Sequence, residues 1–387
     1  MTERLPQSAY TDTAWFTNEL RTVFANAWIP AGTVHDFRAA GDYRTVLCGT
    51  AQIMVIRDKA GNLGAFHNFC RHRGAVLLDD REGNCGSVLV CPYHRWTYAL
   101  DGALRGIPDR AECFPDLDLS AHGLKPAAFG VFRDIVFVNP DPNADFATWI
   151  EPLQDKAWPH DLAASDVSEA VPLYYDMKCD WKIYVENALD GYHLSYLHEK
   201  TIGGPPPGLN AWNIFGDHLV WYATEEGIRH RLPLKIRSKY GTAGAIRSAA
   251  TPGYGGVYYL FPATLLLLTP WAFSWSTLHP VAPGRCRLVM RHWIGPGQTK
   301  DLRKYIQGYD KRTNTISSDG WTVHPLESGD FQTEDMWICE MIQKGMESPA
   351  YEHGPLARGA GGEDAIALFH GLMSRAMSLP GQQPQTD

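Results

Sequence analysis

The sequence predicts an α+β protein, with a small all-β domain followed by a larger domain that contains both strands and helices. Three observations support this fold class. Between positions 30 and 139 the chain consists of short β-like runs broken by Gly and Asp. Further strand-like runs follow position 210, and helical patterns begin near Thr13, Trp181 and Phe331. At 387 residues the chain is long enough for two domains of ordinary size.

The first element is a helix predicted over Thr13–Trp28, because a Thr that can cap it precedes apolar residues at helical spacing. The following β region contains two turn signals, Lys59–Asn62 and Asp101–Gly102, and both predict hairpins. The most apolar run, Leu260–Trp275, is interrupted by two prolines and is shorter than a membrane span requires. We interpret this run as buried strands and expect no contact with a membrane.

Composition excludes some classes of function. The chain is 44% hydrophobic and 20% charged, which is an ordinary globular balance. A net charge of −8 argues against binding to nucleic acid, which depends on a basic face. No signal peptide is apparent, and six of the eight cysteines are scattered without spacing. We therefore expect reduced thiols and a cytoplasmic protein.

Two cysteine–histidine pairs lie within the β region: Cys70 with His72, and Cys91 with His94. Structural zinc sites usually present paired cysteines or paired histidines, which these pairs do not match well. A Rieske 2Fe–2S cluster needs two cysteines on one iron and two histidines on the other. Two loops that each supply one of both types would satisfy that requirement.

A further group of candidate metal ligands lies in ENALDGYHLSYLH, Glu186–His198. Asp190 and His193 share a helical face, whereas His193 and His198 are five apart. Both histidines can bind one ion only if the helix loosens or ends between them, as at a π-bulge. Two imidazoles with one carboxylate from elsewhere suit divalent iron, although such histidines can also be simply packed or solvated.

The predicted helix Phe331–Ser348 offers that carboxylate. Asp335 begins a stripe of otherwise apolar residues, and a carboxylate on an apolar face is costly to bury unless it is paired or bound to metal. The alternative is an Asp that only interacts favourably with the helix dipole in the first turn.

The motifs HNFCRHRGA and CPYHRWTYALDG resemble the Rieske signature of ring-hydroxylating oxygenase α subunits, and NALDGYHLSYLH resembles the iron-binding segment of the same family. The resemblance extends over nearly the whole chain. It implies a helix-grip catalytic domain with an antiparallel sheet, and it makes Cys70, His72, Cys91 and His94 the cluster ligands. His193, His198 and Asp335 become ligands of a mononuclear iron, and Asp190 becomes a bridge between the two metal centres. Arg95 departs from the pattern, since the family usually has Gly there.

The family resemblance also implies partners. A separate reductase would oxidise NADH or NADPH and pass electrons, directly or through a ferredoxin, to the 2Fe–2S cluster and on to Fe(II), where O2 reacts. No nucleotide-binding fingerprint is present in this chain, so that reductase must be another polypeptide. A homotrimer is expected, with each cluster beside the iron of the next subunit.

The expected substrate is a small organic molecule that is hydroxylated or demethylated. The segment CEMIQKGMESPAYEHGPLA resembles the choline, betaine and carnitine branch, while ENALDGYHLSYLH also resembles hydroxylases of aromatic acids. A quaternary ammonium group would favour an aromatic box. The candidate walls are Trp212, Tyr222, Trp271, Phe273 and Trp275, and Glu186, Asn187 and Leu194 are expected to border the cavity over the iron. The alternative of another class is a Rieske electron carrier without catalytic activity.

We expect four regions: an N-terminal helix on the catalytic domain (1–29), the Rieske domain (30–145), the catalytic domain (146–380) and a disordered tail (381–387). The segment 225–253 is rich in Arg and Lys. We interpret it as a solvated basic loop, with a substrate-attracting lid as the alternative.

Overall fold

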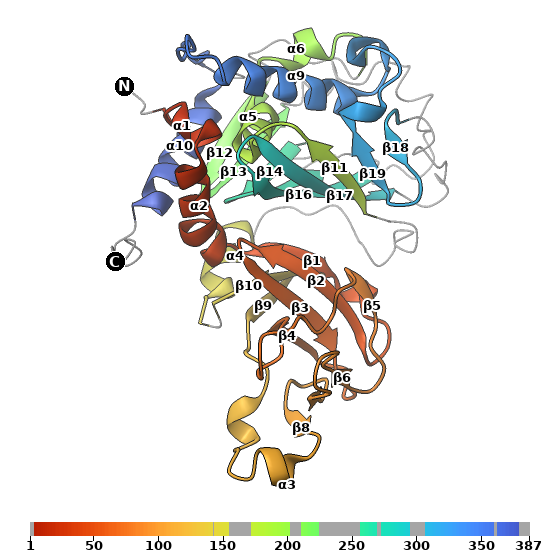
Figure 1. Ribbon diagram of the computed structural model, residues 1–387. Coiled ribbons are helices and arrows are strands. Elements are labelled where there is room, and N and C mark those ends of the chain that lie inside the picture. Colours follow the sequence, from red (N-terminus) through yellow and green to blue (C-terminus); the bar gives the residue numbers. More distant parts are fainter. Residues whose placement is uncertain are drawn as a thin grey trace. The chain divides into compact units, whose positions relative to one another are not determined.

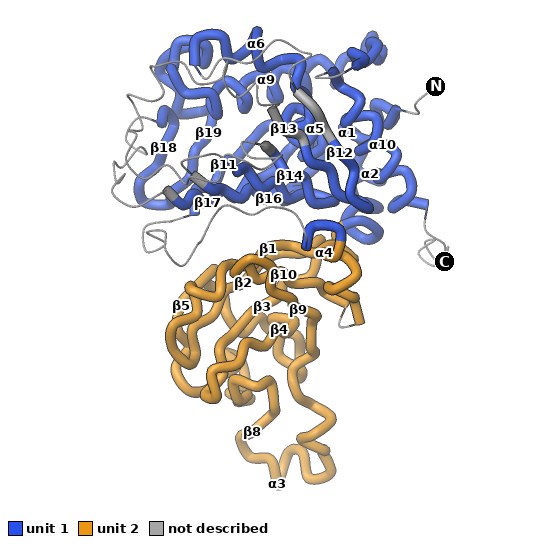
Figure 2. The backbone as a smooth tube through the Cα atoms, turned by 180° about the vertical axis from the view of Figure 1, so that it is seen from behind, with its two compact units in different colours: residues 1–23, 152–387 blue, residues 24–151 orange. Residues whose placement is uncertain are grey.

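The computed structural model describes residues 4–141, 143–154, 172–201, 210–223, 256–268, 272–294, 306–359 and 362–378. The chain forms two compact units (Figure 2). The small unit is Phe24–Glu151, and the large unit combines Met1–Val23 with Pro152–Asp387. The basic segment 225–253 and the tail 381–387 lie outside the described residues.

The small unit is built from three antiparallel sheets, in the strand orders β1-β10-β9, β4-β3-β2-β5 and β6-β7-β8 (Figure 1). The strands are β1 (Ile29–Thr33), β2 (Asp42–Cys48), β3 (Ala51–Arg57), β4 (Leu63–His67), β5 (Glu82–Asn84), β6 (Leu89–Val90), β7 (Thr97–Tyr98), β8 (Leu104–Gly106), β9 (Ala128–Phe132) and β10 (Ile135–Asn139), with a short helix α3 (Arg110–Cys113) and helix α4 (Phe146–Gln154) at the boundary. An all-β domain was expected here, and the sheets confirm it.

Both predicted hairpins are present. Between β3 and β4, Asp58 and Asn62 pair through their backbones, and Gly61 supplies a φ of +90°. Between β7 and β8, Gly102 has a φ of +85°, a conformation that favours glycine. The Asp101 carboxylate accepts a hydrogen bond from the amide of Ala103 (3.0 Å), which holds this turn closed.

The large unit contains one nine-stranded sheet with the order β12-β13-β14-β15-β16-β17-β11-β19-β18. Its strands are β11 (Leu173–Met177), β12 (Asn210–Phe215), β13 (His218–Ala223), β14 (Gly256–Leu260), β15 (Thr264–Leu268), β16 (Ala272–Ala282), β17 (Arg285–Ile294), β18 (Tyr309–Asp310) and β19 (Thr315–Ser317). The sheet is antiparallel except where β11 and β19 run parallel. The run Leu260–Trp275 contributes to three of these strands, as expected.

The helices of the large unit are α1 (Ser8–Thr11), α2 (Thr13–Thr22), α5 (Trp181–Leu189), α6 (Leu194–Leu197), α9 (Phe331–Met346) and α10 (Asp364–Met377). Helix α5 packs against α9, α10 and the sheet (Figure 1). Within the described part of the chain, no helix has both the length and the apolar character needed to cross a membrane.

The N-terminal helix is shorter than predicted. Asp12, rather than Thr13, caps α2 by accepting a hydrogen bond from the amide of Trp15 (2.8 Å). The helix ends at Thr22, and a 3-10 turn follows at Phe24–Asn26. Apolar residues beyond this point, such as Ala27 and Ile29, are buried in a core of the small unit. The prediction was too long because apolar residues continue in the sequence beyond the point where the helix ends, and they serve a different core.

One face of the nine-stranded sheet carries the helices. Tyr259 pairs with Leu265, which pairs with Ser276, so all three project from the same face. The ring of Tyr259 lies 5.8 Å from Phe369 of α10, and Trp181 of α5 contacts the same phenylalanine. We call this side of the sheet the helix face.

The start of α5 is held by a buried ion cluster. Lys182 Nζ lies 2.7 Å from a carboxylate oxygen of Glu19 on α2 and 2.7 Å from one of Asp180, which caps α5. The side chains of Lys182 and Glu19 are fully buried. Gln343 of α9 accepts a hydrogen bond from the backbone amide of Asp180 (2.9 Å). Two other helices, α2 and α9, therefore fix the start of the helix that leads to the candidate iron ligands.

Candidate metal centres

The two candidate iron histidines lie at either end of a single helical turn. Helix α5 ends at Leu189, and Asp190 has an extended backbone. Helix α6 then spans Leu194–Leu197, with His193 directly before it and His198 directly after it. The helix was expected to loosen or end between the two histidines, but α5 already ends before His193, and a separate helical turn lies between His193 and His198.

Asp335 meets both histidines from α9. The Nε2 atoms of His193 and His198 are 3.3 Å apart, and Asp335 Oδ1 lies 3.1 Å from His198 Nε2 and 3.7 Å from His193 Nε2. Among the described residues, these three form the one group of His, Cys, Asp or Glu side chains close enough to share a metal ion. His198 and Asp335 are buried, whereas His193 is half-buried.

This geometry fits a divalent ion. Three donors that meet at right angles about 2.1 Å from an ion lie about 3 Å from one another, close to the separations seen here. Two imidazoles and one carboxylate form the facial arrangement that leaves positions open on non-heme iron. The imidazoles are also oriented toward a common ion, because both histidines direct Nε2 at the shared site and Nδ1 at other carboxylates.

Each of the three donor residues has its own supporting partner. Asp190 Oδ2 lies 3.1 Å from His193 Nδ1, and Glu334 Oε2 accepts from His198 Nδ1 at 2.7 Å. Asn187 donates from Nδ2 to Asp335 Oδ1 (2.9 Å). Such partners set the tautomer and orientation of metal-binding residues.

Glu334 is the functional residue that sequence reasoning missed. Its carboxylate is buried and also accepts a hydrogen bond from the Thr201 hydroxyl at 2.7 Å. The adjacent pair Glu334–Asp335 at the start of a helix could have indicated this role. Neighbouring helical residues point in different directions, so one carboxylate can bind the metal while the other accepts a hydrogen bond from a ligand.

The electrostatics of the site follow from these contacts. Burial would lower the pKa of His193, but the nearby carboxylates of Asp190 and Asp335 outweigh it and raise that pKa to about 9. Burial opposes ionisation of Asp335, yet hydrogen bonds from His193 and His198 lower its pKa below the usual range. The carboxylate is therefore kept ionised, which is the form that binds metal.

The structure separates the three residues expected to border the cavity over the iron. Asn187 contacts Asp335, and Leu194 directly follows a candidate ligand. The Glu186 carboxylate lies elsewhere: Oε1 accepts from the Tyr10 hydroxyl (2.5 Å) and is 3.0 Å from Nε2 of the buried His370. Glu186 thus ties α5 to α1 and α10, because its side chain leaves α5 on a different side from Asn187.

Two of the expected aromatic walls lie on the wrong side of the sheet. Phe273 and Trp275 alternate with residues of the helix face and project from the opposite face. There the Trp275 ring packs 5.2 Å from Trp293, and the Arg291 guanidinium lies 5.3 Å from the Trp275 ring. The expectation that they line a pocket beside the iron ligands is wrong. The side chains of Trp212, Tyr222 and Trp271 lie outside the described residues.

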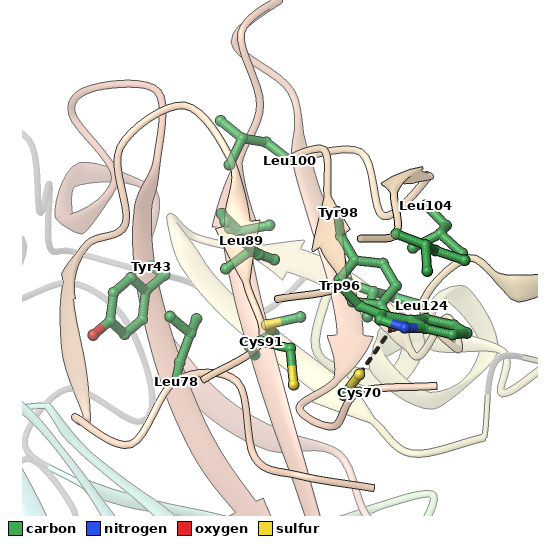
Figure 3. Packing of buried hydrophobic residues seen from close by; sticks show 13 residues of the cluster. Tyr43, Cys70, Leu78, Leu89, Cys91, Trp96, Tyr98, Leu100, Leu104 and Leu124 are labelled. Carbon is green, nitrogen blue, oxygen red and sulfur yellow. Dashed lines mark hydrogen bonds between the residues drawn. The ribbon is translucent and has the colours of Figure 1, made fainter. Parts of the chain in front are cut away.

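The second candidate centre lies in the small unit. Cys70 and Cys91 are buried in a core with Trp96, Tyr98 and several leucines (Figure 3). The Cys70 thiol lies 3.3 Å from the Tyr98 hydroxyl. The rings of His72 and His94 are 4.7 Å apart and only half-buried. The loops therefore place two sulfurs inward and two imidazoles outward.

This arrangement fits a 2Fe–2S cluster. The two loops close in similar ways, since the amide of Gly74 donates to the carbonyl of Cys70 (2.9 Å) and that of Arg95 donates to Cys91 (3.1 Å). Nδ1 of His72 is buried and lacks a hydrogen-bond partner among the described residues. A buried nitrogen without a partner is costly unless it binds something, and a cluster iron would satisfy it.

Comparison with known proteins identifies the two domains in which these centres lie. Residues 27–120 match the family description "Rieske [2Fe-2S] domain", and residues 165–379 match "Ring hydroxylating alpha subunit (catalytic domain)". The oxygenase subunit of glycine betaine monooxygenase from Chromohalobacter salexigens is 36% identical, with 92% of this chain and 82% of that protein covered. The chloroplastic choline monooxygenase of Arabidopsis thaliana is 28% identical over 97% of this chain and 83% of its own length.

Solved structures show the same fold. The quaternary ammonium Rieske monooxygenase CntA superposes with a TM-score of 0.72 at 21% identity, covering 96% of this chain and 95% of that one. Naphthalene 1,2-dioxygenase from Rhodococcus sp. gives a TM-score of 0.69 at 20% identity, covering 97% and 94%. The chain belongs to the family of ring-hydroxylating oxygenase α subunits, oxidoreductases that carry a 2Fe–2S cluster and a mononuclear iron and receive electrons from NADH or NADPH through a separate reductase.

Proposed function

We propose that this chain is the terminal oxygenase component that hydroxylates or oxidatively demethylates a small quaternary ammonium compound, such as a betaine, choline or carnitine. The observation that carries this proposal is the 36% identity to a glycine betaine monooxygenase subunit over nearly the whole chain. Similarity to choline monooxygenase over the same length points to the same class of substrate.

His193, His198 and Asp335 would hold the mononuclear iron, and Cys70, His72, Cys91 and His94 would hold the cluster. The distances and burial described above support both sets. When bound, the iron supplies the activation of dioxygen. Asn187 keeps Asp335 oriented, while Glu334 and Asp190 each hold one imidazole with Nε2 directed at the ion.

The overall reaction balances with two electrons from the reductase. An N-methyl group, O2, two electrons and two protons give an N-hydroxymethyl group and water. The N-hydroxymethyl product then breaks its C–N bond, releasing formaldehyde and the demethylated amine. Hydroxylation at a carbon that is not attached to nitrogen would have the same stoichiometry without formaldehyde.

The decisive experiment measures oxygen uptake with NADH and a surrogate reductase. Glycine betaine, choline and carnitine should each be compared with benzoate, which represents the aromatic-acid alternative. Coupled uptake with an ammonium compound, together with formaldehyde, supports demethylation. Uptake with benzoate alone would contradict the proposed substrate class. The purified protein should contain three irons per chain, and stoichiometric zinc in a colourless protein would contradict the metal assignment.

We further propose a homotrimer in which Asp190 links the two centres between subunits. Asp190 is positioned for this by its contact with His193 and by hydrogen bonds from the amides of Tyr192 and His193 (2.6 and 3.3 Å), which leave its carboxylate partly exposed. It would accept a further hydrogen bond from His94 of the partner subunit. A head-to-tail contact that is repeated around a threefold axis would close the ring and leave no unpaired interface.

Asp190→Asn tests this bridge. The variant should assemble, keep both metal centres and accept electrons from the reductase, but reoxidation of its cluster by substrate and O2 should nearly stop. Asp217→Asn, an exposed aspartate of the same unit, is the matched control. Wild-type turnover of Asp190→Asn would exclude the bridging role.

The remaining proposals concern partners and location. A ferredoxin can carry the electrons between reductase and cluster. We propose a cytoplasmic location, because none of the eight cysteines, each of them in the described residues, forms a disulfide bond. The proposed domains, 1–29, 30–145 and 146–380, follow the two compact units except at their boundaries.

A further inference from the structure

Strand β17 carries a histidine on the helix face that has no partner within the described residues. Ser276 projects from the helix face and pairs with Met290, so His292, two residues further along β17, projects from the same face. Ser274 lies directly opposite His292 on β16. No hydrogen bond or ion pair joins the side chain of His292, Ser274 or Ser276 to another described residue. Polar side chains on a covered face usually have a partner, so these three are available to a ligand.

The cover over the helix face loosens along β17. Leu288 is 0% exposed and Met290 is 6% exposed, whereas His292 is half-buried. Leu267 of β15, in the same row of the sheet as His292, is also half-buried. The opposite face shows no such change, since Trp293 is 1% exposed. The loosening is therefore confined to the helix face and does not come from an open strand end.

The surface that His292 keeps accessible lies inside the protein. Burial lowers the pKa of this imidazole to about 4. An imidazole at the outer surface would keep a pKa of about 6.5, because bulk water solvates its charged form. A side chain that retains accessible surface and is nevertheless so strongly dehydrated borders an enclosed space. We call the space bordered by Leu267, Ser274 and His292 the sheet hollow.

The sheet hollow lies in the direction of the candidate iron ligands. The later part of α9 is near Lys178, whose backbone amide donates to Glu340 (3.1 Å). The start of α9 is near Tyr175, because burial and the carboxylate of Asp330, which caps α9, raise the pKa of that tyrosine. Since β17 is antiparallel to β11, the direction from Lys178 to Tyr175 is also the direction in which β17 leads to His292. The start of α9, where the ligands meet, is therefore displaced toward the sheet hollow.

The groups that β16 and β17 direct into the sheet hollow are neutral. Arg291, the neighbour of His292, projects from the opposite face, where its guanidinium lies 4.9 Å from the Trp293 ring. A neutral imidazole and a serine hydroxyl can each donate a hydrogen bond to a carboxylate. In glycine betaine one carbon separates the carboxylate from the ammonium group, so a cationic residue would attract one end and repel the other. Neutral donors bind the carboxylate without that repulsion.

We propose that His292, together with Ser274, recognises the carboxylate of a betaine-type substrate whose ammonium group lies toward the iron. This inference rests on the proposed function and narrows it, because it selects zwitterionic ammonium compounds over choline. The imidazole donates to one carboxylate oxygen and the hydroxyl donates to the other. Directly opposite residues of antiparallel strands have Cβ atoms about 5 Å apart, so both donors can reach one carboxylate. The substrate then supplies the partner that the protein does not.

Anaerobic calorimetric titration of the metal-loaded protein separates recognition of the carboxylate from binding of the cation. Glycine betaine is compared with tetramethylammonium, which has the same cationic group without a carboxylate. The wild type should bind glycine betaine about tenfold more tightly or better, as expected for hydrogen bonds to a charged group. His292→Leu should weaken binding of glycine betaine about tenfold and change binding of tetramethylammonium less than about twofold. His292→Gln keeps a donor and should recover most of the affinity.

His279→Leu is the matched control, because His279 lies on β16 but projects from the opposite face. It should bind both compounds like the wild type, and iron content with cluster absorbance shows that each variant is intact. If His292→Leu weakens both compounds equally, the residue only shapes the hollow and the proposal is wrong. If it binds both like the wild type, His292 lies outside the substrate site and the proposal is equally wrong.

Two more outcomes complete the test. Ser274→Ala is a minimal change that decides the question if His292→Leu does not fold: it should weaken glycine betaine selectively, and unchanged binding contradicts the proposal. A wild type that binds choline more tightly than glycine betaine contradicts it as well. If the wild type binds none of these ammonium compounds and turns over benzoate instead, the proposed function itself fails, which is a different result from a silent His292→Leu.

Discussion

Replacing Glu334 by glutamine would show how much of the iron affinity depends on a carboxylate that does not touch the metal. The substitution keeps the size of the side chain and an oxygen that accepts from His198 Nδ1, but it removes the negative charge. The contact is 2.7 Å long and both side chains are 1% exposed, so solvent screens it little.

The magnitude follows from the kind of hydrogen bond that is lost. A hydrogen bond to a charged partner contributes about 1.5–3 kcal/mol, and a neutral one about 0.5–1.5 kcal/mol. The substitution therefore removes about 1.4 kcal/mol of support for His198, which corresponds to roughly tenfold weaker binding of Fe(II). This lies at the lower end of the ten- to hundredfold effects typical of such partners.

The assay is anaerobic competition for Fe(II) with a coloured chelator, while the cluster absorbance reports that the small unit stays intact. Thr201→Val serves as a comparison, because it removes the second hydrogen bond to Glu334 but leaves the charge in place. It should weaken iron binding less than Glu334→Gln. If Glu334→Gln holds iron within twofold of the wild type while Asp335→Asn loses it, the supporting role assigned to Glu334 is wrong.

Three further predictions concern stability and are measured by urea unfolding. Lys182→Met should cost about 3–5 kcal/mol because it leaves two buried carboxylates without a cation, whereas Lys178→Met, at a more exposed ion pair, should cost at most about 1 kcal/mol. Burial raises the pKa of Asp180 to about 7 although the adjacent lysine opposes this. Its contribution to the free energy of unfolding therefore falls as pH rises from about 4 to about 7, and Asp180→Asn should remove that decline. Gly102→Ala should destabilise more than Gly74→Ala: both have positive φ, but a Cβ at Gly102 would lie 2.5 Å from an aromatic ring, and one at Gly74 meets nothing within 4 Å.

Residue types and spacing predicted much of both candidate centres. Cys70, His72, Cys91 and His94 occupy two similar loops, as the presence of one Cys and one His in each pair indicated. The helical pattern placed Asp335 at the head of an apolar stripe, and α9 begins where that pattern placed it; the preference for Asp335 as the ligand came from the resemblance to the family. The five-residue gap between His193 and His198 predicted an irregular helix, but it placed the break between the histidines, whereas α5 ends before both of them.

Other features depended on contacts that no local pattern records. Glu186 lies one turn before Asp190, yet its direction is set by Tyr10 and His370, about 180 residues away on either side. Phe273 and Trp275 had the composition expected of an ammonium-binding box, but strand register decides which face they project from. Register depends on pairing between distant segments and could not be read from one segment alone.

The chain order of the two units has a consequence for how the protein is made. The small unit is a continuous segment, Phe24–Glu151, and can fold as soon as it has left the ribosome. The N-terminal residues before it cannot dock so early, because Leu5 contacts His370 and Gln7 donates to the carbonyl of Ser348. Such contacts between distant positions form late and slowly. Loops able to receive an iron–sulfur cluster therefore exist during synthesis before the mononuclear site does, and the segment translated just before the small unit is among the last to pack.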